Sequence, residues 1–380
     1  MKVLHIITGL GVGGAEQQLR LLLRHLPVRC DVVTLTNPGT VAEGITADGG
    51  RVAHLGMGGN RDLTALARLT RLVRRGRYDV VHTHLYRACV YGRLAARLAG
   101  VRTVVATEHS LGAAQIEGRP LRAGVRSLYL ATERLSTATV AVSATVAQRL
   151  RDWGVPPPRI HVVPNGIEAH RFRYDSAARR AVRDRIGLPH DAFVVGGVGR
   201  LAEGKRFDIL VRAVAALPGA RLLVVGEGPE RARLHELAGR LGAADRVLLT
   251  GACEDPPRRA VEPGLPGLLS AMDVFVSASP EEAFGLAVVE ALAAGLPVLH
   301  VTCPAVDDLP PDAAPGAHRV TGTEDGIRDA LRLLRAGSRT RRLPVPAAVG
   351  HYDIAHTAER LMSVYTQAHP HAEKSPRCPG

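Results

Sequence analysis

Two carboxylates, Glu282 and Glu290, lie eight residues apart in a stretch that joins an apolar run to an apolar helix. Residues 273–278 have the composition of a buried strand, and helix-forming composition continues from Gly285 to the stop signal at Gly295. The helix is apolar nearly all round, so we expect it to be buried. A buried carboxylate without a partner is costly, so Glu290 must have one.

Two interpretations of Glu290 remain open. In the first, its carboxylate is tied to backbone donors or to an arginine. In the second, its two acceptor oxygens hold a vicinal diol such as a ribose. The backbone N–H groups of Phe284, Gly285 and Leu286 at the helix start favour a nearby anion. A diol combined with an anion suggests a sugar nucleotide.

Two cations, Arg200 and Lys205, follow the predicted strand 193–198 and precede a helix. Cations at a helix start oppose its dipole unless an anion lies between them. A diphosphate fits, because arginine grips phosphate in a fork and lysine acts as a point charge. The alternative is two solvated surface cations. Gly226 and Gly228 form a turn at the next strand end, which is placed to pass beneath a nucleobase.

Histidines follow two strands of the first half. His82 and His84 come at the end of strand 80–83, and His109 follows strand 103–107 beside Glu108 in a polar cluster. A lone histidine is more often structural than catalytic. We therefore expect His82 in the core and His109 facing a ligand cleft, and we do not expect the cleft position for His84.

A glycine loop follows the first strand. Gly9, Gly11 and Gly14 fit the pattern G-x-G-x-x-G, which raises the alternative of a dinucleotide-binding dehydrogenase. Such enzymes place an acid at the end of the second strand, whereas here Asp31 stands at its beginning. The missing acid at the strand end weakens the dinucleotide interpretation. The glycines still indicate a loop whose backbone can approach a ligand closely.

Strand and helix patterns alternate along the whole chain, and its 380 residues exceed what one core usually supports. We predict an α/β protein of two Rossmann-like domains facing each other across a cleft, with the boundary near 164–173. Ligands are expected beyond the carboxyl ends of the strands. The predicted strands are 3–8, 31–35, 52–55, 80–83, 103–107, 139–142, 160–163, 193–198, 221–225, 246–249, 273–276 and 297–299.

Composition narrows the class of protein. Five scattered cysteines without a CxxC pair argue for a reducing compartment and against a disulfide or metal framework. With neither a signal peptide nor a membrane-spanning run, we expect a cytoplasmic protein. Of the net charge of +13, residues 1–170 carry +11, which suits an anionic acceptor or peripheral contact with the inner face of an anionic membrane. The alternative is that arginine-rich helix faces carry this charge without any binding role. No nucleic-acid-binding motif accompanies the charge, and no nucleic acid partner is expected.

Taken in order, these motifs resemble the family-4 retaining glycosyltransferases of GT-B fold over roughly residues 1–300. The elements that carry the resemblance are Gly13-Gly14-Ala-Glu16, His109, Asn165-Gly166-Ile167, Gly199-Arg200-x4-Lys205, Gly226-x-Gly228 and Glu282-x7-Glu290. The resemblance implies an acceptor domain at 1–170, a donor domain at 171–345 and a helix at 346–368 that crosses back to the first domain. We expect the tail 369–380 to be disordered.

The resemblance also implies roles for single residues. The expected catalytic residues are His109, Glu282, Arg200 and Lys205. The expected donor-binding residues are Gly13, Gly14, Arg200, Lys205, Gly228, Phe284, Gly285, Leu286 and Glu290. Arg200 and Lys205 would neutralise the diphosphate, Glu290 would hold the ribose and His109 would contact the donor sugar. No metal and no cofactor are expected, because the two cations stabilise the charge and there is no Asp-x-Asp motif near a strand end of the donor half.

The implied reaction is metal-independent transfer of a sugar, with retention, from a nucleotide sugar, expected to be a UDP-sugar, to an envelope glycan, lipid-linked or natural-product acceptor. A sugar-phosphate synthase, a phosphorylase and a catalytically silent sugar-nucleotide-binding protein are the alternatives. Two segments depart from the family pattern: 300–308 lacks its usual glycine pair, and 252–266 is long and proline-rich.

Overall fold

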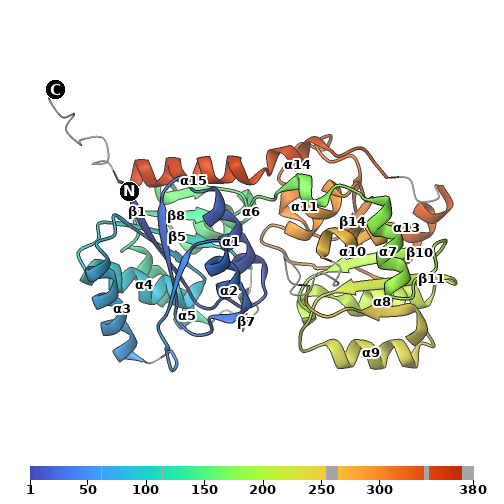
Figure 1. Cartoon of the computed structure of the whole chain (residues 1–380), viewed down its shortest axis with the longest axis horizontal. Helices are drawn as coiled ribbons and strands as arrows, with labels where there is room; N and C mark the ends of the chain where they lie inside the picture. Colours follow the sequence, from blue (N-terminus) through green and yellow to red (C-terminus); the bar gives the residue numbers. More distant parts are fainter. Residues whose placement is uncertain are drawn as a thin grey trace. The chain divides into compact units, whose positions relative to one another are not determined.

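The computed structural model describes residues 1–60, 62–112, 115–117, 119–120, 122–253, 264–337 and 342–369. They form two compact units (Figure 1). Unit 1 comprises Met1–Gly166 and the chain from Ile354 onward, and unit 2 comprises Ile167–Asp353. The tail predicted to be disordered lies, after His369, outside the described residues, and so does the central part of the 252–266 segment.

Within its described residues, unit 1 is built on a seven-stranded parallel sheet of order β3-β2-β1-β4-β5-β8-β9. The strands are β1 (Lys2–Ile7), β2 (Arg29–Thr34), β3 (Arg51–His54), β4 (Val80–His84), β5 (Thr103–Glu108), β8 (Ala138–Ala141) and β9 (Ile160–Val162). The helices are α1 (Gly14–His25), α2 (Gly39–Ala47), α3 (Leu63–Gly76), α4 (Tyr86–Leu98), α5 (Ala123–Glu133), α6 (Ala144–Trp153) and α15 (Ile354–Ala368). A short hairpin pairs β6 (Gln115–Ile116) with β7 (Arg119–Pro120).

The described part of unit 2 contains a six-stranded parallel sheet of order β12-β11-β10-β13-β14-β15. The strands are β10 (Phe193–Val198), β11 (Ala220–Val225), β12 (Val247–Leu249), β13 (Val274–Ser277), β14 (Val298–His300) and β15 (Ala317–Arg319). The helices are α7 (Ser176–Arg185), α8 (Phe207–Ala215), α9 (Arg231–Arg240), α10 (Leu265–Ala271), α11 (Leu286–Ala293), α12 (Pro304–Asp307), α13 (Glu324–Gly337) and α14 (Ala347–His351).

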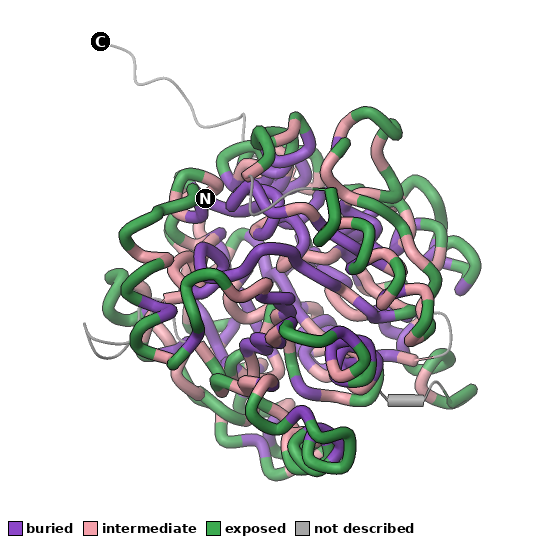
Figure 2. The backbone as a smooth tube through the Cα atoms, turned by 90° about the vertical axis from the view of Figure 1, so that its right-hand side faces the viewer, coloured by how far each residue is buried: buried purple, intermediate pink, exposed green. Residues whose placement is uncertain are grey.

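The two parallel sheets confirm the predicted fold class. Central strands such as β1 and β11 read as continuous apolar runs because helices cover both faces of a parallel sheet. Figure 2 shows that the buried stretches gather in the interior, whereas exposed stretches lie mainly at the periphery. The sequence analysis missed β15, whose three residues include a histidine and an arginine and are half-buried or exposed.

Helix α15 belongs to unit 1 because its apolar stripe packs on that sheet. Ile354, Ala358, Leu361 and Tyr365 recur at intervals of three and four residues, which places them on one face of the helix. They are buried in a cluster with residues of β1, β4 and β5. Within the described chain, no helix is both long enough and apolar enough to cross a membrane.

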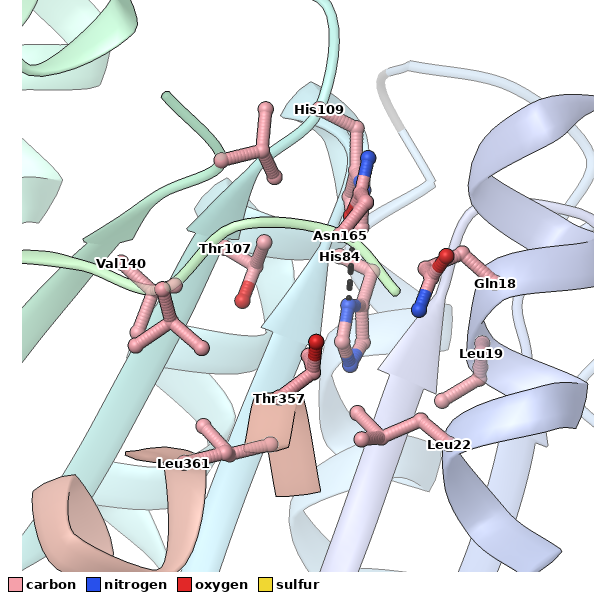
Figure 3. Close-up of a pocket in the computed structure, with 12 residues that line it drawn as sticks. Gln18, Leu19, Leu22, His84, Thr107, His109, Val140, Asn165, Thr357 and Leu361 are labelled. Atoms are coloured by element: carbon pink, nitrogen blue, oxygen red, sulfur yellow. Dashed lines mark hydrogen bonds between the residues drawn. The ribbon is translucent and has the colours of Figure 1, made fainter. Parts of the chain in front are cut away.

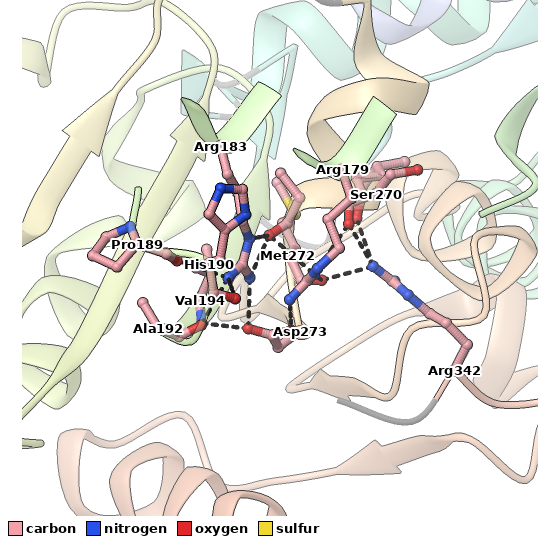
Figure 4. Close-up of polar contacts among 12 residues, drawn as sticks. Arg179, Arg183, Pro189, His190, Ala192, Val194, Ser270, Met272, Asp273 and Arg342 are labelled. Carbon is pink, nitrogen blue, oxygen red and sulfur yellow. Dashed lines mark hydrogen bonds and ion pairs between the residues drawn. The ribbon is translucent and has the colours of Figure 1, made fainter. Parts of the chain in front are cut away.

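A cluster of arginines in unit 2 holds the amino-terminal ends of β10 and β13 (Figure 4). Asp273 Oδ1 accepts a hydrogen bond from Arg179 at 2.7 Å, and Asp273 Oδ2 accepts from Arg183 at 2.8 Å and from the Val194 backbone at 2.8 Å. Arg342 donates to the Met272 carbonyl at 2.8 Å. Because ligands of such sheets bind at the opposite, carboxyl ends, this cluster is structural.

Candidate functional site

The carboxyl ends of the unit 2 strands carry the predicted donor-side residues. Arg200 follows β10, Gly226 follows β11 and Glu282 lies beyond β13. Lys205 ends a 3-10 turn, Glu203–Lys205, directly before α8. The strand order places β10 between β11 and β13, so these loops meet at one edge of the sheet.

Lys205 and Glu282 form an ion pair in which Lys205 Nζ contacts Glu282 Oε1. Their side chains are 34% and 15% exposed, so water and ligands reach them. Ser279, three residues before Glu282, is buried, and its Oγ lies 3.0 Å from the Gly204 carbonyl and 2.8 Å from the Glu281 carbonyl. Ser279 therefore ties the two loops together. Sequence reasoning gave it no role, although a hydroxyl at a strand end was the available signal.

Arg200 presents an exposed guanidinium at this edge. With the described part of the chain the guanidinium makes no ion pair or hydrogen bond, while neighbouring Gly199 is held by a backbone hydrogen bond of 3.0 Å to Val225. A cation held at a sheet edge without a protein partner is available to an anionic ligand.

The glycine turn after β11 has a packing reason. Gly226 has a φ of +152°, and a Cβ there would lie 1.9 Å from the Gly199 carbonyl oxygen. A Cβ on Gly228 would lie 2.3 Å from the carbonyl oxygen of Leu201. The turn therefore lies directly against the backbone that carries Arg200, and glycine is required for this approach.

Helix α11 begins one residue after Gly285, which has a φ of +105°. A Cβ on Gly285 would lie 2.5 Å from Cys303 Sγ. The buried thiol of Cys303 lies 3.5 Å from the Phe284 carbonyl, and the Phe284 ring packs edge to face on Tyr352 at 4.9 Å. The loop after β14 thus packs against the start of α11. The sequence analysis assigned no contacts to this loop, because it lacks the glycine pair usual in the family.

Glu290 lies in the second turn of α11 and is half-buried. Its neighbours Val288, Val289, Ala291 and Leu292 are buried as predicted. Helix α11 is mostly buried, as expected, but Glu290 lies on its less buried side together with Leu286 and Ala287. A partly exposed carboxylate on an otherwise apolar helix is accessible to a ligand hydroxyl.

In unit 1, His109 lies just beyond β5 and is linked to His84 (Figure 3), which is linked in turn to His5. His84 Nδ1 lies 3.0 Å from His109 Nε2, and His84 Nε2 lies 3.0 Å from His5 Nδ1. Burial lowers the pKa of His5 to about 3 and that of His109 to about 4. Burial, followed by the neighbouring histidines, also lowers the pKa of His84 well below its usual value. All three rings are neutral at physiological pH.

His82 belongs to the core, as predicted. It is fully buried, with its Nδ1 2.6 Å from the Tyr365 hydroxyl and its Nε2 2.7 Å from Thr107 Oγ1. Tyr365 comes from α15, so His82 joins that helix to the sheet.

Glu108 does not share a polar cluster with His109, contrary to the sequence interpretation. Successive residues of a strand point to opposite faces, and the Glu108 carboxylate is buried on the other side. It accepts a hydrogen bond of 2.6 Å from the Tyr129 hydroxyl and lies 3.9 Å from buried Arg93. Glu108 therefore has a structural role.

A small cavity of about 20 Å³ adjoins His84 and His109. Gln18, Thr107 and Asn165 also border it (Figure 3). With the Gln18 amide nitrogen turned toward the Gly166 carbonyl, it donates to that oxygen at 2.9 Å, and the amide oxygen accepts from Gly166 N–H at 3.2 Å. The cavity has room for one group of about the size of a water molecule or hydroxyl.

Gly13 and Gly14 open helix α1 beyond β1. A Cβ on Gly13 would lie 2.4 Å from Glu16 Oε2, so a side chain there would displace this carboxylate. Because β4 lies between β1 and β5, the two glycines and His109 come from the same edge of the unit 1 sheet.

Comparisons with known proteins agree with this picture. Residues 12–171 match the family model Glycosyltransferase Family 4, and residues 178–343 match Glycosyl transferases group 1. A D-inositol 3-phosphate glycosyltransferase of Acidothermus cellulolyticus is 36% identical over 323 residues, which are 77% of this chain and 68% of the relative. One of Mycobacterium bovis is 34% identical over 317 residues, covering 77% of this chain and 62% of the relative. The chain thus spans about two thirds of the length of these relatives.

Solved structures share the fold. Anabaena HepE in complex with UDP-glucose superimposes with a TM-score of 0.83 at 21% identity, covering 97% of this chain and 100% of HepE. A sucrose-phosphate synthase of Thermosynechococcus elongatus gives 0.77 at 20% identity, covering 97% of this chain and 99% of the synthase.

Proposed function

Because the chain belongs to glycosyltransferase family 4, we propose that it transfers a sugar from a UDP-sugar to an anionic acceptor, with retention of configuration and without a metal or other cofactor. In this proposal unit 2 binds the donor and unit 1 binds the acceptor. The observation that carries it is the pair of cations, Arg200 and Lys205, at the carboxyl edge of the unit 2 sheet.

Each donor-side residue contacts the part of the nucleotide sugar that suits its chemistry. The Arg200 guanidinium and the Lys205 ammonium neutralise the diphosphate and stabilise the charge that develops on it as the sugar leaves. The backbone of Phe284–Leu286 contacts the phosphate and sugar, and Gly228 keeps the opposite side of the nucleotide open. The Glu290 carboxylate accepts from the two ribose hydroxyls.

Within unit 2, Glu282 positions the donor sugar. Within unit 1, His109 contacts a sugar oxygen, and Gly13 and Gly14 let a ligand approach the backbone at the same edge of that sheet. Attack occurs on the face from which the diphosphate leaves, through an oxocarbenium-like transition state. The leaving phosphate oxygen takes the proton of the acceptor hydroxyl, so no carboxylate has to act as a covalent nucleophile.

A UDP-sugar as donor is supported by HepE, whose structure contains UDP-glucose. An inositol phosphate is the first acceptor to test, because two relatives at 34–36% identity are inositol 3-phosphate glycosyltransferases. The net charge of +11 over residues 1–170 favours such an anion. An anionic lipid-linked or envelope acceptor would use the same charge, and the reaction would then take place in the cytoplasm at the inner membrane face.

The test is a turnover assay in the presence of EDTA. UDP release is measured with a panel of UDP-sugars and with inositol 3-phosphate, free inositol, orthophosphate or anionic lipid vesicles as acceptor. We expect release that depends on inositol 3-phosphate, with the product anomer matching the donor. Release that requires orthophosphate would instead indicate a phosphorylase. Binding of UDP-sugar without turnover by any acceptor would favour a silent binding protein.

A further inference from the structure

Three histidines of unit 1 form a continuous hydrogen-bonded chain. His5 lies in β1, His84 ends β4 and His109 follows β5, so the chain crosses three neighbouring strands toward the carboxyl edge of the sheet. Both ring-to-ring contacts are 3.0 Å between nitrogens, and both centroid separations are 5.3 Å. His5 and His84 are buried.

Neutral imidazole rings carry one N–H each, so every contact in the chain needs one donor and one acceptor. Only two arrangements satisfy both contacts. In the first, all three rings carry the proton on Nδ1, and His109 Nδ1 is a donor. In the second, all three carry it on Nε2, and His109 Nδ1 is an acceptor. The tautomer of His109 is therefore coupled to that of His5, two rings away.

The ends of the chain decide between the arrangements. His5 Nε2 and His109 Nδ1 are both buried and have no hydrogen-bond partner among the described residues. A buried N–H without an acceptor is rarer than an unused lone pair. The Nε2 arrangement would leave such an N–H on His5, which no ligand reaches. The Nδ1 arrangement leaves it on His109, whose ring borders the small cavity, so a ligand oxygen that enters this cavity supplies the acceptor.

We propose that His5 and His84 are positioning residues that hold His109 in its Nδ1–H tautomer, so that His109 Nδ1 donates a hydrogen bond to an oxygen of the bound sugar. This proposal rests on the proposed function for the identity of the ligand. The hydrogen-bonded arrangement of His5, His84 and His109 rests only on the geometry of the three rings. An N–H at this point would fix the orientation of the sugar that binds there, and it would favour sugars that carry an oxygen at the matching position.

A metal ion is a poorer explanation for the same histidines. One nitrogen each from His5, His82 and His84 lie within 4.8 Å of one another, as ligands of one ion would. However, five of the six nitrogens of these rings already have hydrogen-bond partners at 2.6–3.0 Å. Binding an ion would break several of these bonds, whereas the imidazole chain uses those of His5 and His84 and leaves those of His82 intact.

The direct test is nitrogen NMR of the full chain labelled with ¹⁵N-histidine, with signals assigned through single substitutions. The pattern of protonated and unprotonated nitrogens identifies the tautomer of each ring. We expect Nδ1–H for His5, His84 and His109. An Nε2–H tautomer of His109, or a spectrum that changes on addition of Zn²⁺ as expected of coordinated rings, would overturn the proposal.

Substitutions at His5, which contacts no ligand, test the positioning role through kcat and through the His109 signals. In His5→Asn the amide N–H can replace the Nδ1–H donor to His84, whereas His5→Leu has no donor. We expect His5→Leu to lower kcat about tenfold with the KM for the donor nearly unchanged, and His5→Asn to stay within about threefold of wild type. In His5→Leu the His109 signals should show a mixture of tautomers.

His82→Leu is the matched control, because His82 is equally buried but outside the chain. It should lower the melting temperature and leave the His109 tautomer unchanged. Equal kcat values for His5→Asn and His5→Leu, with unchanged His109 signals, would contradict the positioning role. If no combination of nucleotide-sugar donor and acceptor substrate supports turnover, the proposed function fails. The NMR result still decides whether His5 and His84 set the tautomer of His109.

Discussion

The ammonium of Lys205 contacts the carboxylate of Glu282 across the gap between the loops that follow β10 and β13. The cation that we assign to the donor diphosphate thus already has an anionic partner in the protein. Donor phosphate and Glu282 would compete for Lys205, or share it, when the nucleotide sugar binds.

This competition predicts opposite effects of two substitutions. Glu282→Gln frees Lys205 and should raise the affinity for UDP a few-fold while lowering kcat, because the donor sugar loses a positioning group. Lys205→Met should weaken UDP binding by about tenfold or more. Isothermal titration calorimetry measures both affinities. The pair is partly exposed and contributes only about 0.2–1 kcal/mol to stability, so neither variant should melt much earlier. Weaker UDP binding by Glu282→Gln would contradict the competition.

Arg200→Ala should lower kcat/KM about 100-fold or more, because a charge-stabilising group is lost from the transition state. Its melting temperature should equal that of wild type, since the exposed guanidinium has no partner among the described residues. Arg233→Ala, another exposed arginine of unit 2, is the matched control and should keep full activity. If Arg200→Ala retained near-normal turnover, its role at the diphosphate would be wrong.

Glu290 can be tested through the ligand as well as the protein. Wild type should bind UDP about 10–100 times more tightly than 2′-deoxyuridine diphosphate, because a charged hydrogen bond to the 2′-hydroxyl is lost. Glu290→Ala should bind the two nucleotides with similar affinity. If Glu290→Ala still bound UDP more tightly than the 2′-deoxy nucleotide, another group would recognise the ribose. The role of Glu290 would then be structural.

The buried histidines predict how stability depends on pH. Burial lowers the pKa of His5 to about 3 and of His109 to about 4, and the pKa values of His82 and His84 lie well below the usual value. Between these values and about 6.5 the unfolded chain binds more protons than the folded chain. The free energy of unfolding should therefore fall as pH drops from about 6.5 to 4.5, and these four rings should together contribute up to about four protons taken up on unfolding.

Urea unfolding across this pH range measures the slope. His5→Asn removes one of the four groups, so its slope should be shallower by about one proton. A free energy of unfolding that stays constant between pH 6.5 and 4.5 would mean that these rings are already protonated in the fold, which the hydrogen-bonded chain does not allow.

Sequence patterns predicted the two parallel sheets because each central strand is a continuous apolar run followed by a turn and a helix. They also placed Arg200, Lys205 and Glu282 at strand ends, and one edge of the unit 2 sheet brings them together. The Lys205–Glu282 pair itself was not predictable, because it joins residues 77 positions apart through the side-by-side packing of β10 and β13.

The hydrogen-bonded histidines of unit 1 show more clearly that contacts between distant residues cannot be predicted from local sequence. His84 was not expected at the site because a single histidine at a strand end carries no signal of its partners. Its link to His5 and His109 depends on strand order and on the register that sets β1 beside β4 and β4 beside β5. Side-chain direction explains the error at Glu108, which faces the opposite side of β5 from the one assumed. β15 was missed because its short, polar sequence resembles a loop.

The most direct test of the central claim, that unit 2 holds a nucleoside diphosphate without a metal, is the melting temperature of the full chain with UDP, GDP, ADP, dTDP or NAD in EDTA. We predict stabilisation by UDP that grows with concentration and corresponds to about 2.7 kcal/mol at 100 times the Kd. Arg200→Ala should lose most of this stabilisation. Stabilisation by NAD alone, or stabilisation by UDP that appears only after a divalent cation is added, would contradict the account.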